Sequence, residues 1–328
     1  MKAKSEGFKT PGVYIDEVNA FPNAVVEVAT AVPVFIGYTP QAIYEGKSYT
    51  NIPTKITSFA DFKAIFCNPD PPAPTPPASQ YSPQYHTNKV KAKPAQGEYF
   101  TFNGDYYTIE PDQSTIYYLY NSVRLFYQNG GGDAYIVSIG TYGPEMKEVK
   151  APGAPIVNPN VQLSELLHGL SLVANEEEIT LYVVPEATLL KPEDNGTLMQ
   201  AMLSQNASVQ TAMSLLDLIG GNEPDPIMYT QDIENFRNST GADGLMYGAA
   251  YYPFLKTTIT QPGEITYLNL NGGDVKALSE IINPPQNPNE AAATILSQIE
   301  AGNSGLTTAQ LNNALIQQVK PTVKYSIL

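Results

Sequence analysis

The chain has 328 residues, of which 42% are hydrophobic and 15% are charged, and its formal net charge is −14 at pH 7. This length predicts two or three domains. We expect no nucleic-acid partner, because phosphate binding needs clustered basic side chains and the longest such cluster is Lys89, Lys91 and Lys93. No run of residues approaches the roughly 18 apolar positions that span a bilayer, so we also expect no direct membrane insertion.

The cysteine content and the N-terminus indicate where the chain is made. Cys67 is the single cysteine, so no internal disulfide can form, as is usual in a reducing compartment. The opening residues, MKAKSEGFKTPG, contain no apolar segment of the kind that a secretory signal needs. The sequence therefore predicts synthesis in a cytoplasm.

Residues 1–22 are predicted to form an extended N-terminal arm. Pro11 and Gly12 precede a short β-prone run, whose members are Val13, Tyr14, Ile15, Asp16, Glu17 and Val18. An isolated strand leaves its backbone groups unpaired, so this run must complete a sheet in the same chain or in a neighbouring copy.

Residues 23–150 are predicted to form an α/β domain. Residues 32–38 are apolar on both faces, which is typical of a buried central strand. Ser58 begins a short amphipathic helix, and a second helix is predicted from Ser114 to the glycines at 130–132, with a strand over 134–140. A proline-rich exposed insertion is expected at about 68–112, with a hairpin turn at Asn103 and Gly104.

Residues 151–328 are predicted to form a second α/β unit that ends in helices. Apolar strands are expected at 179–187, 211–217 and 245–255, and helical patterns lie between them. Such alternation is typical of a largely parallel sheet, so the fold class is α/β with mixed sheets flanked by helices. Three further helices are expected at 274–283, 289–301 and 307–319.

The sequence lacks the parts that enzyme chemistry needs, so we expect no catalytic, cofactor-binding or metal-binding residues. Neither His86 nor His168 has a cysteine or second histidine at metal-ligand spacing. The glycines at 130–132 follow a helix instead of preceding one, which indicates a helix C-cap and not a phosphate cradle. Cys67 lies on an apolar helix face, where packing is the expected role, and the acidic run at 176–178 is typical of a solvated surface.

Taken in order, several segments resemble the contractile phage tail sheath family, including the sheaths of extracellular contractile injection systems. The segments are TPGVYIDEV at 10–18, AVPVFIGYT at 31–39, SVRLFYQNGGGDAYIVSIG at 122–140, LLD at 215–217 and YGAAYYPFL at 247–255. We expect the C-terminal domain of that family to be missing here, so that the chain is either a fragment or a shortened relative.

This resemblance implies a structural subunit that polymerises around an inner tube and contracts to drive the tube through a target envelope. The implied partners are other copies of the chain, the inner tube protein, and the baseplate and cap proteins. The assembled particle would be a virion or an extracellular or membrane-bound contractile machine. No cofactor is implied, and the segment at 13–18 becomes the expected inter-subunit arm.

Three alternatives stay open at the level of sequence. A sheath-like paralogue at the baseplate or tail end would share the fold and occur in few copies. A surface adhesin or carbohydrate-binding protein would use the 22 tyrosines and the proline-rich loop. A hydrolase of the α/β class would need a deep pocket with a perturbed carboxylate or histidine.

Overall fold

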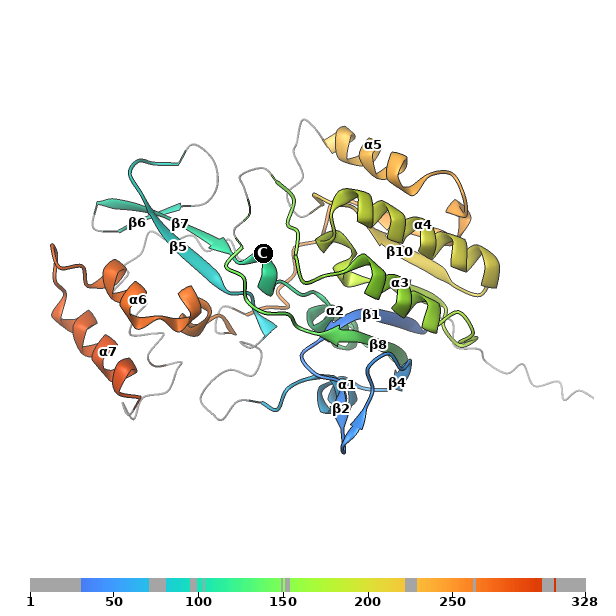
Figure 1. Ribbon diagram of the computed structural model, residues 1–328, viewed down its shortest axis with the longest axis horizontal. Helices are drawn as coiled ribbons and strands as arrows, with labels where there is room; N and C mark the ends of the chain where they lie inside the picture. The colour runs from blue at the N-terminus through green and yellow to red at the C-terminus, as the bar shows by residue number, and fades with distance from the viewer. Residues whose placement is uncertain are drawn as a thin grey trace, which may run out of the picture. The chain divides into compact units, whose positions relative to one another are not determined.

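A computed structural model describes residues 31–70, 81–94, 99–102, 104–148, 150, 154–221, 229–261, 264–302 and 310. The predicted arm, residues 1–22, lies outside the described residues, as does the helix predicted at 307–319 apart from residue 310. The largest sheet has six strands in the order β11-β10-β9-β1-β8-β4 (Figure 1). Their bounds are β1 Pro33–Thr39, β4 Thr54–Ile56, β8 Ala134–Thr141, β9 Leu181–Val183, β10 Met213–Asp217 and β11 Gly248–Tyr251. No described helix is long and apolar enough to cross a membrane.

The sheet is parallel except at one end, where β4 runs antiparallel to β8. Strand β1 lies in the interior of the sheet, with β8 on one side and β9 on the other, and all seven of its residues are buried. A strand enclosed in this way must be apolar on both faces, which is the pattern read from residues 32–38. The prediction of an α/β fold with mixed sheets is confirmed.

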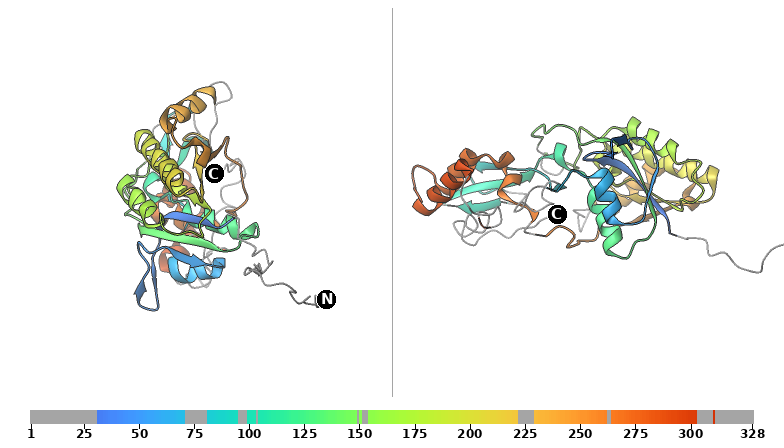
Figure 2. Two further views of the ribbon diagram at one scale, coloured as in Figure 1. Left: turned by 90° about the vertical axis from the view of Figure 1, so that its right-hand side faces the viewer. Right: turned by 90° about the horizontal axis from the view of Figure 1, so that it is seen from below.

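Helices cover both faces of the six-stranded sheet (Figure 2). On one face, α3 (Leu163–Leu172) packs against alternate residues of β1 and β8, and α4 (Pro192–Val209) packs beside α3 over β10. On the other, α1 (Phe59–Phe66) and α2 (Leu119–Gln128) pack against the intervening residues. Gly169 allows α3 to approach closely, because a Cβ atom there would lie 2.6 Å from Ile36 Cγ2. Because successive side chains of a strand point to opposite faces of the sheet, each strand contributes alternate residues to two separate cores.

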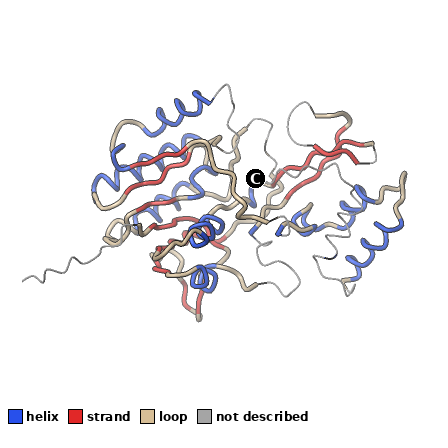
Figure 3. Tube along the Cα trace, turned by 180° about the vertical axis from the view of Figure 1, so that it is seen from behind, coloured by secondary structure: helices blue, strands red, loops and turns tan. Residues whose placement is uncertain are grey.

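A second, three-stranded sheet is antiparallel, in the order β5-β7-β6. Its strands are β5 Tyr85–Val90, β6 Tyr99–Phe102 and β7 Asp105–Pro111, and Gly104, with φ +84°, lies in the predicted turn. Helices α6 (Val275–Ile282) and α7 (Glu290–Ala301) lie beside it (Figure 3). Tyr107 packs with α6 and α7 in a separate core, so the described part of the predicted insertion is a sheet with its own hydrophobic core.

The remaining described elements are short or peripheral. Strands β2 (Ile43–Tyr44) and β3 (Lys47–Ser48) form an exposed hairpin. Helix α5 (Tyr229–Thr240) lies against α4, where Gln200 Nε2 donates a 2.7 Å hydrogen bond to the Ser239 carbonyl. Short 3₁₀ helices cover Gln113–Thr115, Pro185–Leu189, Leu245–Tyr247, Tyr267–Asn269 and Asn271–Gly273.

Several element boundaries differ from those predicted. The sequence places a domain boundary near residue 150, but β1 pairs with β8 from before it and with β9 from after it, so strands from both predicted units share one sheet. Helix α2 begins at Leu119 and not at Ser114, because Asp112 caps a 3₁₀ turn over Gln113–Thr115. The strand predicted at 245–255 is confined to β11, since a 3₁₀ turn precedes it and Pro253 follows.

Candidate functional site

The predicted arm needs a sheet edge to pair with, so the candidate site is sought at the two edges of the six-stranded sheet. The arm residues Val13, Tyr14, Ile15, Asp16, Glu17 and Val18 themselves lie outside the described residues. The sheet ends in β4 on one side and in β11 on the other. An edge strand offers unpaired N–H and C=O groups to another strand, and proteins usually protect such edges with charge or brevity.

The β4 edge is protected in both ways. The strand has three residues, and Lys55 at its centre carries an exposed ammonium group. Lys55 Nζ lies 2.7 Å from Glu178 Oε2 and 3.1 Å from Asp133 Oδ2. Hydrogen bonds from Nζ to Glu178 and Asp133 raise the pKa of Lys55, so the group stays charged. A strand added here would have to displace this exposed charge network.

The β11 edge is not protected by charge. From Gly244 to Leu255 the sequence, GLMYGAAYYPFL, contains no charged residue. Among the described residues β11 pairs with β10 alone, in parallel register from Ser214↔Gly248 to Asp217↔Tyr251. Large apolar side chains in and around the strand are exposed, namely Leu245 (52%), Met246 (79%), Tyr251 (72%) and Leu255 (89%). We call β11 with these four side chains the β11 edge.

Packing against α4 and α5 fixes the position of the β11 edge. A Cβ atom at Gly248 would lie 2.6 Å from Leu203 Cδ2 of α4, so a larger residue there would require the Leu203 side chain to shift. Beyond the strand, Tyr252 donates a 3.0 Å hydrogen bond to Asp232 Oδ2 of α5, and the Phe254 N–H bonds the Gly221 carbonyl at 2.8 Å. The strand is thus held from behind while its outer edge stays open among the described residues.

A buried carboxyl group, which the sequence analysis did not single out, lies at the start of α2. Glu186 is fully buried, and its Oε1 accepts hydrogen bonds from the N–H groups of Leu119 (2.9 Å) and Tyr118 (3.3 Å). Within the part of the chain that the structure describes, its Oε2 has no hydrogen-bond partner, and burial raises the pKa of Glu186 to about 8. Gly37 makes room for it, since a Cβ there would overlap the carboxylate. The available signal was a glutamate inside the apolar run LYVVPEATLL.

The residues that the sequence analysis considered for enzyme chemistry lie at a helix end, in a core, on a helix surface and on β5. Helix α2 is capped by Asn129, and Gly130 after it takes φ +83°, which confirms the predicted helix end at the glycines. Cys67 packs in the core beside α1 and α2, and burial raises the pKa of its thiol to about 12, which leaves the thiol protonated and unreactive near neutral pH. His168 is exposed on α3. His86 Nε2 lies 3.4 Å from Asp112 Oδ2, a proximity that the 26-residue separation does not reveal.

The fold and this edge define an α/β protein with one protected and one uncharged sheet edge. No family model matches the chain, and no curated protein matches it. Among solved structures, the chain is similar to the helical sheath of the anti-feeding prophage in its contracted state, determined by cryo-electron microscopy, at 20% identity and a TM-score of 0.32. The match covers 75% of this chain and 45% of that one, so less than half of the sheath chain is matched.

Proposed function

We propose that this chain is a structural subunit of a contractile tail sheath, with a mechanical and not a catalytic role. The support is the ordered set of sequence segments that resembles the sheath family. One structural observation carries the proposal: four of these segments, spread over residues 31 to 255, contribute β1, β8, β10 and β11 to one sheet, and the last is its uncharged edge. Such a body can hold its shape while a strand from another copy adds to its edge.

In this proposal, residues 13–18 of one copy pair with the β11 edge of the next. Strand addition supplies main-chain hydrogen bonds, and alternate side chains supply specificity. The arm, residues 1–22, has three lysines and three acidic residues, and the β11 edge has no charged residue, so the pairing would rest on main-chain hydrogen bonds and apolar contacts. Because donor and acceptor are different surfaces, the contact repeats into rings or helices and does not close as a dimer.

The wider assembly follows from the same proposal. The subunits would surround an inner tube protein and join baseplate and cap proteins, after synthesis in a cytoplasm. Contraction would rotate rigid bodies that stay linked through their arms. The finished particle would be a virion tail or an extracellular or membrane-bound injection machine, and no cofactor enters this role.

Cysteine cross-linking tests the strand pairing directly. Ala250→Cys is mixed with chains that carry Cys in place of Tyr14, Ile15 or Asp16 in turn, so that neighbouring registers and both strand faces are sampled. Paired positions on adjacent strands lie within disulfide reach, so oxidation should give a covalent heterodimer for at least one mixture. Ser204→Cys, exposed on α4, is the matched control and should give none.

Two outcomes would contradict this pairing. The first is the absence of heterodimer from every mixture of folded variants. A further variant carries Ala250→Cys and the arm cysteine in the same chain. The second contradictory outcome is a disulfide that forms only within this double variant, which would mean that each arm covers its own edge. Peptide mapping separates these products from any involving the native, buried Cys67.

Electron microscopy tests the function itself. The native gene product should form hollow striated cylinders, and deletion of residues 1–20 should leave a folded protein that forms none. Normal cylinders from the deletion would reject the arm, and an absence of cylinders from the native product would favour the low-copy paralogue or the binding-protein alternative.

A further inference from the structure

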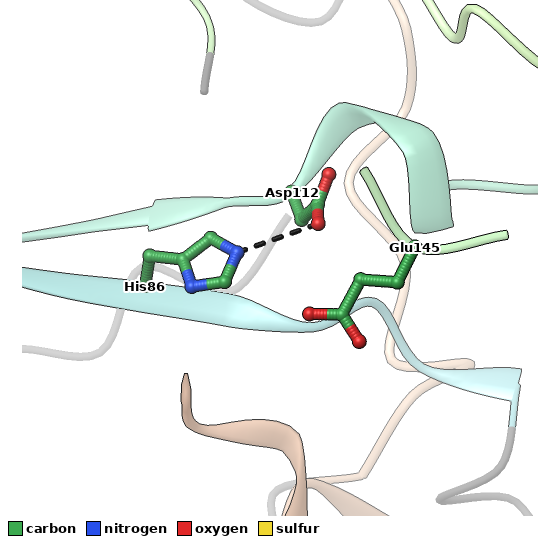
Figure 4. A group of neighbouring side chains, drawn as sticks. All are labelled: His86, Asp112 and Glu145. Atoms are coloured by element: carbon green, nitrogen blue, oxygen red, sulfur yellow. Dashed lines mark hydrogen bonds and ion pairs between the residues drawn. The ribbon is translucent and has the colours of Figure 1, made fainter. Parts of the chain in front are cut away.

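Three side chains with metal-ligating atoms meet beside the three-stranded sheet. His86 belongs to β5, Asp112 directly follows β7, and Glu145 lies on the segment after β8. One potential ligand atom from each lies within 4.8 Å of the others. Figure 4 shows the imidazole and the two carboxylates directed toward one common space.

The chain holds Asp112 rigidly in this position. Its side chain is fully buried, and Oδ1 accepts hydrogen bonds from Ser114 N (3.0 Å), Ser114 Oγ (2.8 Å) and Glu148 N (2.9 Å). Its Oδ2 accepts one hydrogen bond from Lys147 N at 2.9 Å. The other side of Oδ2 faces His86. A carboxylate whose other bonds are satisfied by the protein is oriented in the way that metal ligands usually are.

The spacing between His86 and Asp112 fits a shared cation. Their Nε2 and Oδ2 atoms are 3.4 Å apart, which is longer than the 2.9–3.0 Å of a typical N–H···O hydrogen bond. In a tetrahedral zinc site with bonds of about 2.0–2.1 Å, neighbouring ligand atoms lie about 3.4 Å apart. The imidazole is largely buried, with 13% of its side chain exposed, whereas Glu145 is exposed and can close onto an ion.

We propose that His86, Asp112 and Glu145 bind one divalent transition-metal ion of the zinc class, with water as the fourth ligand. Nitrogen and carboxylate oxygen are both suitable zinc donors, and the ion would neutralise two carboxylates in a strongly acidic protein. It would link β5, the turn after β7 and the segment at 145–148, which are distant in sequence. The sequence analysis predicted no metal ligand here, because the three residues are separated by 26 and 33 positions and only the fold brings them together.

Metal titration of the full chain, prepared without a histidine tag and stripped of metal, tests this proposal. Calorimetric titration with Zn²⁺ should give one ion per chain, and Zn²⁺ should raise the thermal unfolding temperature, because binding to the folded state stabilises it. His86→Ala and Glu145→Gln should each weaken binding at least about tenfold. His168→Ala removes the other histidine and should bind as the native chain does.

Cobalt provides an independent readout of the coordination geometry. Co²⁺ bound to the native chain should show the intense visible absorption of a tetrahedral complex, and His86→Ala should lose it. Circular dichroism of each variant confirms that it remains folded. The proposal is overturned if the native chain binds no Zn²⁺, or if folded His86→Ala binds Zn²⁺ as tightly as the native chain. Neither result bears on the sheath proposal, which rests on the β11 edge.

Discussion

The six-stranded and three-stranded sheets differ in how much of each strand is buried. The first is covered by helices on both faces, and its strand β1 has no exposed residue. In the second, β5 has no fully buried residue and β7 has one, Tyr107, which packs with α6 and α7. In a sheet covered on both faces, nearly every strand side chain is buried and contributes to the free energy of unfolding. In the smaller sheet, that contribution comes from a few buried side chains. The two regions should therefore respond differently to the same substitution.

Matched leucine truncations should give the largest effect. Leu166 is fully buried on α3 in the larger core, and Leu278 is buried on α6 in the smaller one. Leu166→Ala should lower the free energy of unfolding by about 4 kcal/mol, and Leu278→Ala by about 2–3 kcal/mol, because the smaller core collapses more readily around a cavity. Urea unfolding measures both, and equal losses would contradict the contrast between the two cores.

Glu186 should make the larger region less stable as the pH rises. Its pKa is raised from 4.5 to about 8 in the folded state, so the folded protein binds this proton more tightly than the unfolded chain. The associated stability is present below pH 4.5 and is lost as the pH rises through 8. Glu186→Gln should remove most of this loss, which is on the order of a few kcal/mol.

Urea unfolding of both proteins at pH 5 and pH 8.5 checks this expectation. The glutamine keeps an oxygen that can accept the Leu119 N–H, so the helix cap is preserved in the variant. An unchanged pH slope after the substitution would show that Glu186 does not titrate over this interval.

Arg124 tests whether the two regions unfold together. Its guanidinium makes two hydrogen bonds to Glu264, at 2.7 and 3.0 Å, and connects α2 to the segment that leads into α6. Arg124→Gln should cost about 1–2 kcal/mol, because the half-buried Glu264 carboxylate loses its charged partner. Calorimetry should then resolve separate transitions for the two regions, whereas one unchanged transition would show that other contacts couple them.

Lys55 should have the smallest effect on stability and a distinct effect on association. Its ion pairs with Glu178 and Asp133 are exposed, so Lys55→Val should leave the free energy of unfolding nearly unchanged. The substitution removes the charge that protects the β4 edge, so sedimentation should detect more self-association than in the native chain. Lys276→Val, an exposed control on α6 that belongs to neither edge strand, should leave association unchanged.

The sequence by itself determined the elements whose causes are local. Apolar runs predicted β1 and β8, Ser58 predicted the start of α1, where its side chain accepts from the Asp61 N–H, and the glycines at 130–132 predicted the end of α2. The Asn103–Gly104 pair predicted the hairpin of β6 and β7. Each of these signals acts over a few residues, so no knowledge of the fold was needed.

Only the tertiary structure decided which distant segments meet. Strand pairing joined β1 to β9 across the predicted domain boundary. Strand β7 formed one core with α6 and α7, although more than 150 residues separate the strand from the helices. The same long-range packing buried Glu186 at the start of α2, left β11 at an edge, and brought His86, Asp112 and Glu145 together. These outcomes depend on strand order and packing between segments far apart in the chain, which residue patterns along the sequence do not encode locally.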